Sequence, residues 1–147
     1  MDTFFLDTSA LVKYYYPEIG SEFVETLILS EALLFISDLG ILEFQSALYK
    51  KFRMKQISKT EIENIMKTFR LQLQENYYSI LHLTPKVFNC AQQLLDRYGQ
   101  NISLKTLDAL QCSYPIFLKK MTIISSDLTL INVAKKENIK AINPEQV

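Results

Sequence analysis

The sequence predicts an α/β fold, a three-layer α/β/α domain around a central, mostly parallel sheet of about five strands. Short apolar runs alternate with longer amphipathic segments along the chain, a pattern typical of βαβ units. At 147 residues the chain has the length of about one domain, and it contains no internal repeat, low-complexity tract or linker. We therefore expect residues 1–147 to form a single domain.

The first half of the chain opens with a strand and a helix. The apolar run 4–6 predicts the first strand, and Thr8 and Ser9 begin the helix that follows. An apolar stripe of helical period covers residues 23–32 and leads into a second strand at 33–36. This order of strand, helix and strand is the first βαβ unit.

Helix boundaries are marked clearly in the middle of the chain. Ser58 and Glu61 form a capping box, which starts a helix whose apolar stripe runs over residues 62–77. Thr84 followed by Pro85 starts the next helix, after a third strand at 79–83. We expect that helix to end at Gly99.

The last third of the chain repeats the pattern. A helix is expected within residues 103–119, with Thr106 as its cap. Pro115 interrupts this segment, so we expect the helix to bend or end there. Two final strands are predicted at 122–125 and 140–142.

Composition narrows the class of protein. Sixteen basic and sixteen acidic residues balance, so any contact with nucleic acid must come from a local basic patch. Cys90 and Cys112 lack the spacing of a metal or redox motif and are expected to be buried thiols in a reducing compartment. We see no secretory signal and no apolar run of about 20 residues, so we expect a cytoplasmic protein without a membrane partner.

Carboxylates fall where the predicted strands end. Asp7 ends the first strand, Asp38 and Glu43 follow the second, and Asp127 follows the fourth. Asp108 lies in the first turn of a predicted helix. In an open parallel sheet, ligands bind in the crevice outside the carboxyl ends of the strands. We therefore expect several of these carboxylates to converge on one end of the sheet.

Each carboxylate also has an interpretation without function. Asp7, Asp38 and Asp127 are favoured N-cap residues for the helices that follow them, and Asp108 is stabilised by the helix dipole. Glu43 lies in the apolar neighbourhood ILEFQSAL, where a carboxylate is costly to bury unless it is paired or bound to a cation. An exposed Glu43 between two apolar stripes is the alternative.

A divalent cation would resolve the repulsion among such carboxylates. Acids held close together raise one another's pKa unless a cation is present. Mg²⁺ or Mn²⁺ prefers oxygen ligands and works beside substrate phosphates. Such an ion supports phosphodiester hydrolysis without any histidine, which suits a chain whose only one, His82, lies in a strand run and is interpreted as structural.

Four segments carry a resemblance to a known family. In order, they are LDTSALVKYYYPEIGSE, ISDLGILEFQSALYKK, LKTLDALQC and IISSDLTLINVAKKENIKAINP. They resemble a PIN domain, and more narrowly the VapC-like toxins of type II toxin-antitoxin pairs, from Thr3 to Pro144. The resemblance implies a metal-dependent endoribonuclease that cleaves RNA, forms a homodimer and binds a cognate antitoxin protein.

The resemblance also implies a set of site residues. The four acids that would bind Mg²⁺ or Mn²⁺ and carry out catalysis are Asp7, Glu43, Asp108 and Asp127. The supporting polar side chains beside the first and fourth acids are Thr8, Ser9, Ser125 and Ser126. Asp38 falls on no family acid and is interpreted as a helix cap. Many relatives have histidine where this chain has Gln111.

Candidate contacts to RNA are fewer. Lys13, one or two helical turns from Asp7, is the better candidate for touching an RNA phosphate. The basic segment YKKFRMK is interpreted as a solvated helix end, because lysines are favoured there by the dipole. Tyr14, Tyr15 and Tyr16 are interpreted as packing residues, with base stacking as the alternative.

Rival functions differ in how well they fit. A haloacid-dehalogenase-type phosphatase needs a second aspartate two residues after the first, where this chain has Ser9. A dinucleotide-binding domain needs a glycine-rich turn after its first strand, and this chain has none. The alternative that remains is a non-catalytic PIN-fold module that binds RNA or protein.

Overall fold

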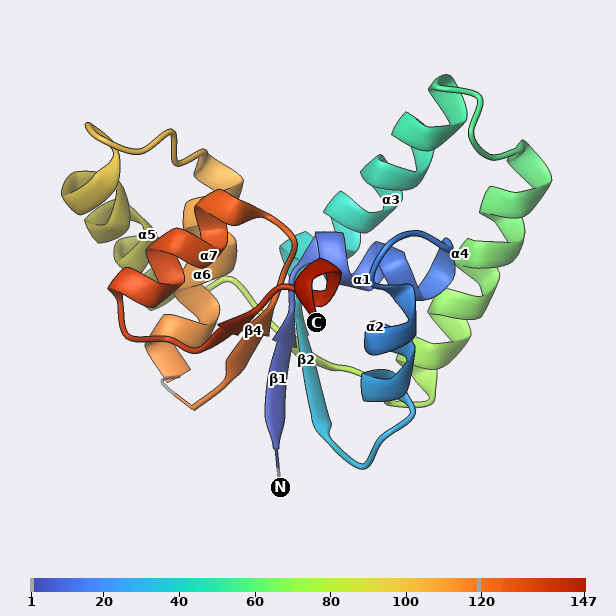
Figure 1. The fold of residues 1–147 in the computed structure, drawn as a ribbon, viewed down its shortest axis with the longest axis horizontal. Helices are drawn as coiled ribbons and strands as arrows, with labels where there is room; N and C mark the ends of the chain where they lie inside the picture. The colour runs from blue at the N-terminus through green and yellow to red at the C-terminus, as the bar shows by residue number, and fades with distance from the viewer. Residues whose placement is uncertain (1, 119) are drawn as a thin grey trace.

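Five strands form one sheet in the computed structural model, which describes residues 2–118 and 120–147 (Figure 1). In chain order they are β1 (Thr3–Leu6), β2 (Leu33–Ser37), β3 (Ser79–Leu81), β4 (Thr122–Ile124) and β5 (Ala141–Ile142). Every neighbouring pair is parallel. The predicted α/β fold with five strands is therefore confirmed, with strand ends that differ from the prediction by one or two residues.

The order of the strands places β1 at the centre of the sheet. The order is β3-β2-β1-β4-β5, so the chain first builds outward on one side of β1 and then crosses to the other. Phe5 of β1 pairs with Phe35 of β2 on one side and with Ile123 of β4 on the other. The strand order thus reverses between β1 and β4, and the crevice above such a switch point is where open α/β sheets bind ligands.

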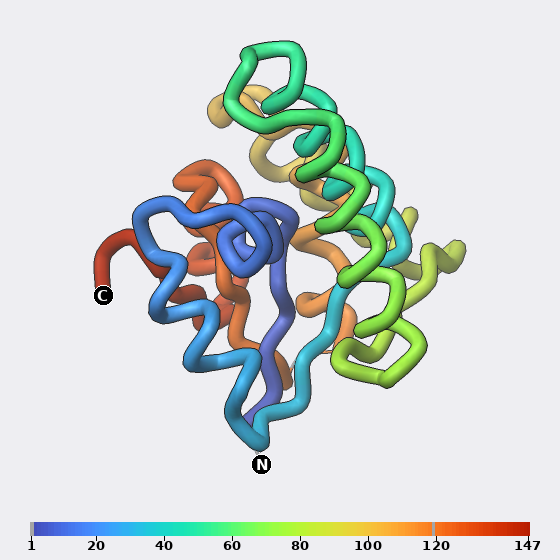
Figure 2. Tube along the Cα trace, turned by 90° about the vertical axis from the view of Figure 1, so that its right-hand side faces the viewer, coloured from blue at the N-terminus to red at the C-terminus, as the bar shows by residue number. Residues whose placement is uncertain are grey.

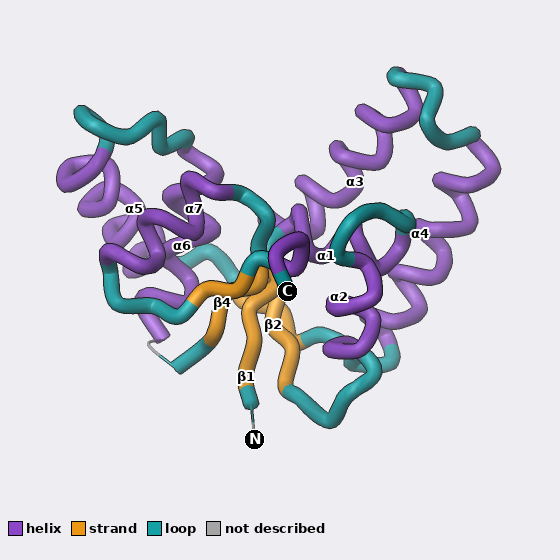
Figure 3. The backbone as a smooth tube through the Cα atoms, viewed as in Figure 1, coloured by secondary structure: helices purple, strands orange, loops and turns teal. Residues whose placement is uncertain are grey.

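Helices cover both faces of the sheet (Figures 1 and 3). One layer contains α1 (Thr8–Tyr15), α2 (Ser21–Ile28), α3 (Asp38–Arg53) and α4 (Lys59–Gln74). The other contains α5 (Pro85–Tyr98), α6 (Thr106–Leu118) and α7 (Leu128–Lys136), and a 3₁₀ helix, Pro144–Gln146, follows β5. Figure 2 shows α3 and α4 side by side as a hairpin that extends beyond the strands.

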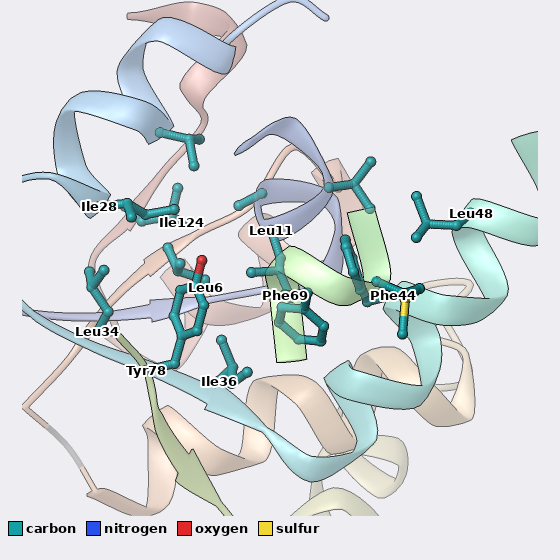
Figure 4. Packing of buried hydrophobic residues seen from close by; sticks show 14 of the residues in the cluster. Leu6, Leu11, Ile28, Leu34, Ile36, Phe44, Leu48, Phe69, Tyr78 and Ile124 are labelled. Atoms are coloured by element: carbon teal, nitrogen blue, oxygen red, sulfur yellow. The ribbon is translucent and has the colours of Figure 1, made fainter. Parts of the chain in front are cut away.

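The core consists of two apolar clusters, one on each face of the sheet. Along a strand successive side chains point to opposite faces. Leu6 and Ile124 accordingly pack beneath the first helical layer, and Phe5 and Ile123 pack beneath the second. Figure 4 shows the first cluster, in which Phe44 and Phe69 lie with ring centroids 4.5 Å apart. Because both faces of the sheet are buried, the strands are continuous apolar runs in the sequence.

The predicted helix boundaries are largely confirmed. The Ser58 hydroxyl accepts the Glu61 N–H while the Glu61 carboxylate accepts the Ser58 N–H, which completes the capping box of α4. Thr84 caps α5, which ends before Gly99. In the described part of the chain, no helix is long and apolar enough to cross a membrane.

Two local predictions are wrong, and one alternative of a third is excluded. Pro115 does not end α6, which continues to Leu118 and holds Asp108 and Pro115 in one helix; the bend at Pro115 stays a prediction. Thr106 is the first residue of that helix rather than its cap. His82 follows β3 instead of lying within it, and its side chain is 74% exposed.

Candidate active site: four carboxylates in one cleft

A cleft of about 520 Å³ lies at the carboxyl ends of the strands, where β1 and β4 diverge into their helices. Six acids line it: Asp7, Glu43, Asp108 and Asp127 from four separate parts of the chain, and also Glu18 and Glu145, which pair with Lys13. The structure therefore brings together all four acids that the sequence singled out. Thr8, Ser9 and Ser126 line the same cleft, and the buried Ser125 reaches Asp7 from below it.

Each acid reaches the cleft from a different part of the fold. Asp7 directly follows β1, and Asp127 lies between β4 and α7. Glu43 comes from the second turn of α3, in one helical layer. Asp108 comes from the first turn of α6, in the other layer. The crevice at the switch point is the place where these elements meet.

Hydroxyl groups hold the Asp7 carboxylate. Ser9 and Ser125 each donate to Asp7 Oδ2 at 2.8 Å. The Ser126 N–H donates to Ser9 Oγ at 3.0 Å, and the Asp127 N–H donates to Ser125 Oγ at 3.0 Å. Burial raises the pKa of Asp7, and these hydroxyl donors oppose the rise. The serines thus couple the ends of β1 and β4 through one carboxylate.

The cap interpretation fails for Asp7 and holds for Asp127. Asp7 occupies the N-cap position of α1, but its side chain makes no capping hydrogen bond. Asp127 Oδ1 accepts the N–H groups of Thr129 and Leu130, so it caps α7 while it lines the cleft. The need for a cap therefore does not account for Asp7.

Glu43 and Asp108 have unusually high pKa values. Burial raises the pKa of Glu43 to about 6, with the negative charges of Asp7 and Asp108 adding to the rise. Burial likewise raises the pKa of Asp108 to about 6, with the charges of Asp127 and Asp7 adding to it. Other carboxylates of the cleft therefore raise the pKa of both Glu43 and Asp108, as expected for like charges without a neutralising cation.

The donor chemistry of the cleft fits a hard divalent cation. All four candidate ligands are carboxylates, the oxygen donors that Mg²⁺ and Mn²⁺ prefer. As they stand, however, no three His, Cys, Asp or Glu side chains within residues 2–118 and 120–147 form a group that could hold a metal ion. Because the acids repel one another, a cation would have to draw them closer together.

Asp38 lies outside the acidic cleft, and the prediction that it caps a helix is wrong. Ser37 is the N-cap of α3, with its hydroxyl accepting the Gly40 N–H. Asp38, the first residue of α3, accepts the Leu39 N–H at 2.8 Å and, from other elements, the Leu83 N–H at 2.9 Å and the Tyr114 hydroxyl at 2.8 Å. Burial works to raise the pKa of Asp38, but these donors outweigh it and lower the pKa.

Lys13, the predicted contact to an RNA phosphate, is buried and paired with two acids. It is 3% exposed, and its ammonium lies 3.1 Å from Glu18 Oε1 and 2.7 Å from Glu145 Oε1. Its charge is therefore already neutralised within the fold. The partner Glu145 lies 132 residues away, so no local pattern could have revealed this pair.

Two lysines of α3 line the cleft together with Lys13. Lys50 and Lys51 were interpreted as a solvated helix end, yet both belong to its wall. Lys51 is 3.4 Å from Glu18 Oε2 and lies over the Tyr16 ring at 4.2 Å. Lys50 is exposed and forms no salt bridge with any residue that the structure describes. It is the freer of the two cations.

The tyrosines near the cleft pack as expected. Tyr15 donates its hydroxyl to Gln72 Oε1 and lies 2.8 Å from the Tyr78 hydroxyl. Its ring packs against Phe44 and Phe69 in the core. Tyr15 is thus a core residue, which supports the packing interpretation over base stacking at this position.

Sequence reasoning missed the role of Gln111. It was noted only for differing from many similar proteins, yet it is 2% exposed and donates through Nε2 to Glu43 Oε1 at 2.9 Å. Its position three residues after Asp108 puts it on the same face of α6. That spacing was the one signal available in the sequence.

Comparison with known proteins supports the predicted fold. Residues 4–143 match the family model described as the PIN domain. The structure resembles that of FitAcB from Neisseria gonorrhoeae, with a TM-score of 0.69 and 12% identity over 98% of this chain and 99% of that one. No curated protein matches the sequence at a significant level.

Two further solved structures share the fold. One is VapBC2 from Rickettsia felis bound to a DNA fragment from its promoter, with a TM-score of 0.64 and 19% identity over 96% of this chain and 98% of that one. The other is a toxin-antitoxin complex from Klebsiella pneumoniae, with a TM-score of 0.62 and 13% identity over 96% and 97%. At these identities the likeness concerns the fold alone.

The raised pKa values predict how the stability of the metal-free protein depends on pH. The folded state binds more protons at Glu43 and Asp108 than the unfolded state does, so these groups favour folding below about pH 4 and lose that contribution as the pH rises through about 6. We expect Asp108→Asn to raise the melting temperature at pH 7 in EDTA by about 3 °C, or about 1 kcal/mol after allowing for partial exposure.

Thermal unfolding followed by circular dichroism from pH 4 to 7 measures both effects. Asp96→Asn, at an exposed acid of α5 outside the cleft, is the matched control and should leave the melting temperature unchanged. A lower melting temperature for Asp108→Asn at pH 7, together with an unchanged pH dependence, would contradict mutual repulsion in the cleft.

Proposed function

The chain belongs to the PIN domain family, and from this premise we propose that it is a Mg²⁺- or Mn²⁺-dependent endoribonuclease, the toxin of a type II toxin-antitoxin pair. PIN domains are generally nucleases. The observation that carries the proposal is the cleft itself, where acids from four separate elements meet at the switch point of a parallel sheet. If each acid served only to stabilise the start of its own helix, the four would not be required to line one cleft.

The four acids have distinct parts in the proposed reaction. Asp7 and Asp108 would be the firmest ligands of the cation, with Glu43 and Asp127 completing the site. A bound divalent cation supplies Lewis-acid stabilisation of a phosphoryl oxygen and a nucleophile from water. Ser9 and Ser125 keep the Asp7 carboxylate pointed at the cleft.

The basic wall of the cleft supports RNA as the substrate. Glu43 and Lys50 lie seven residues apart on one face of α3, and Met54 caps the C-terminus of that helix; all three line the cleft. At 1.5 Å per residue, Lys50 stands about 10 Å along the helix from Glu43. A nucleic-acid strand with one phosphate in the acidic site would therefore pass its next phosphates along Lys50.

Proposed partners follow from the similar structures and from exposed apolar surface. One similar structure is a toxin-antitoxin complex, and another is VapBC2 bound to promoter DNA. In this chain the helices α3 and α4 expose the large apolar side chains of Leu42, Tyr49, Phe52 and Leu71. We propose that this protein binds a cognate antitoxin, forms a homodimer and acts in the cytoplasm.

A second candidate function is a non-catalytic PIN module that binds RNA or protein. One observation favours it: among the residues that the structure describes, no three acids lie close enough together to hold a metal ion. The two functions differ in whether the protein cleaves RNA, so the same experiment decides between them.

Loss of one acid should abolish cleavage. We expect Asp7→Asn and Asp108→Asn each to lower the rate of RNA hydrolysis more than about 100-fold, because each removes a ligand of the proposed cation. The measurement is cleavage of a mixed structured RNA pool by purified protein with Mn²⁺ or Mg²⁺, and with EDTA in parallel.

Two controls accompany this test. Asp96→Asn should cleave like the unchanged protein, since its side chain lies outside the cleft. Circular dichroism should show that both active-site variants keep the fold. Full activity in either variant would refute the role of that acid, and binding of RNA without metal-dependent cutting would favour the second candidate.

Lys50 should affect RNA binding and not metal binding. We expect Lys50→Ala to weaken RNA affinity severalfold and to reduce the slope of log affinity against log salt by about one, because one phosphate contact is lost. Filter binding at several salt concentrations with the Asp7→Asn background measures this without cleavage. Lys67→Ala, at an exposed lysine of α4, is the matched control; equal losses in both variants would argue against a phosphate path along α3.

A further inference from the structure

A buried amide connects one acid of the cleft to the core of the fold. Gln111 of α6 is 2% exposed and bonds to side chains of three other elements. Its Nε2 donates to Glu43 Oε1 of α3 at 2.9 Å and to Thr8 Oγ1 of α1 at 3.3 Å. Its Oε1 accepts the hydroxyl of Ser37, at the end of β2, at 2.6 Å. Both ends of the amide are therefore used.

The orientation of this amide is fixed by its neighbours. Ser37 Oγ accepts the Gly40 N–H at 2.8 Å, so the single hydroxyl proton of Ser37 is free to point at Gln111. If the amide were flipped, its carbonyl oxygen would face the Glu43 carboxylate and its NH₂ would face the Ser37 hydroxyl. The hydrogen bond to Glu43 would then be lost. The chain of hydrogen bonds runs from the Gly40 N–H through Ser37 and Gln111 to Glu43, whose carboxylate oxygen is the final acceptor.

The backbone makes room for the amide at Gly40. A Cβ atom at this position would lie 3.1 Å from Ser37 Oγ and 3.3 Å from Gln111 Nε2, closer than most side-chain contacts allow. A glycine at the start of α3 thus lets α6 approach closely enough for the bond to Glu43. Four residues from three elements are fitted to one another around this contact.

Glu43 needs such a contact because its neighbours repel it. The negative charges of Asp7 and Asp108 act on Glu43 across the cleft, and its side chain is only half-buried. Without a donor, a flexible glutamate would turn toward water. The Gln111 N–H holds one carboxylate oxygen, Oε1, and leaves Oε2 outside this bond, on a side chain that lines the cleft.

We propose that Gln111 is a positioning residue, whose amide, oriented by Ser37 and Gly40, holds the Glu43 carboxylate in place to bind the divalent cation. This inference rests on the proposed function. Outer hydrogen bonds to a ligating carboxylate orient it, and their loss typically lowers metal affinity about 10- to 100-fold. Gln111 also donates to Thr8, but among the proposed ligands it bonds only to Glu43, so its effect on metal affinity should vanish when the Glu43 carboxylate is absent.

A double-mutant cycle measured by isothermal titration calorimetry with Mn²⁺ tests this role. We expect Gln111→Met, which removes the polar amide at similar volume, to weaken the Mn²⁺ Kd about tenfold. In a Glu43→Ala background the same substitution should change the Kd less than about twofold. Equal losses in both backgrounds, or no loss in either, would overturn the positioning role.

The matched control is Gln72→Met. Gln72 is also a buried glutamine with both ends of its amide bonded, to Tyr15 and Tyr14, but it lies in α4 and does not line the cleft. It should lower the melting temperature and leave the Mn²⁺ Kd unchanged. A weaker Kd in this control equal to that of Gln111→Met would mean that general destabilisation explains both.

Ser37→Ala supplies a second variant if Gln111→Met does not fold. It keeps Gln111 and removes only the hydroxyl that orients the amide. We therefore expect the Kd for Mn²⁺ to rise about threefold when Glu43 is present and to stay unchanged in the Glu43→Ala background. An unchanged Kd would overturn the proposed orientation. Failure of the unchanged protein to bind Mn²⁺ would instead overturn the proposed function, and with it this inference.

Discussion

The buried carboxylate of Asp7 is the constraint on which the rest of the cleft depends. Its backbone N–H donates to the Ile124 carbonyl at 3.1 Å, so the residue extends the pairing of β1 with β4 to the point where the strands separate. A buried carboxylate is costly unless it is hydrogen-bonded, and Ser9 and Ser125 provide donors from each side of the junction. The hydrogen bonds that reduce the cost of burying the Asp7 carboxylate also hold the ends of β1 and β4 together.

Neutral groups donate the side-chain hydrogen bonds that hold Asp7, Glu43 and Asp127 in the cleft. Gln111 holds Glu43, and backbone N–H groups at the start of α7 hold Asp127. The one buried lysine in the wall, Lys13, is neutralised by Glu18 and Glu145 instead of by the acids. The four carboxylates therefore keep their mutual repulsion, which is relieved by protons at low pH and, in our proposal, by a divalent cation at neutral pH.

Local features were predictable because their determinants lie close together in the sequence. The capping box joins residues three positions apart, and each strand is a short apolar run that both faces of a sheet bury. The acids could be placed on one cleft because parallel strands end at the same edge. Local reasoning left open whether the helix bends or ends at Pro115, and the structure shows that α6 continues through it between α5 and α7.

Long-range partners could not be predicted. Asp38 accepts the Leu39 N–H of its own helix, but its other two donors, Leu83 and Tyr114, lie 45 and 76 residues away. The partners of Gln111 lie at similar distances, with Glu43 68 residues away and Ser37 74. Such contacts depend on how the two helical layers meet above the sheet, which no local pattern encodes.

The central claim is that the four acids form one cation site, and anomalous diffraction from crystals soaked in Mn²⁺ tests it most directly. The account predicts an anomalous peak in the cleft, coordinated by Asp7 and Asp108, with Glu43 and Asp127 drawn toward it. Crystals that bind Mn²⁺ elsewhere while the cleft holds none, or an ion bound without Asp7, would contradict the account.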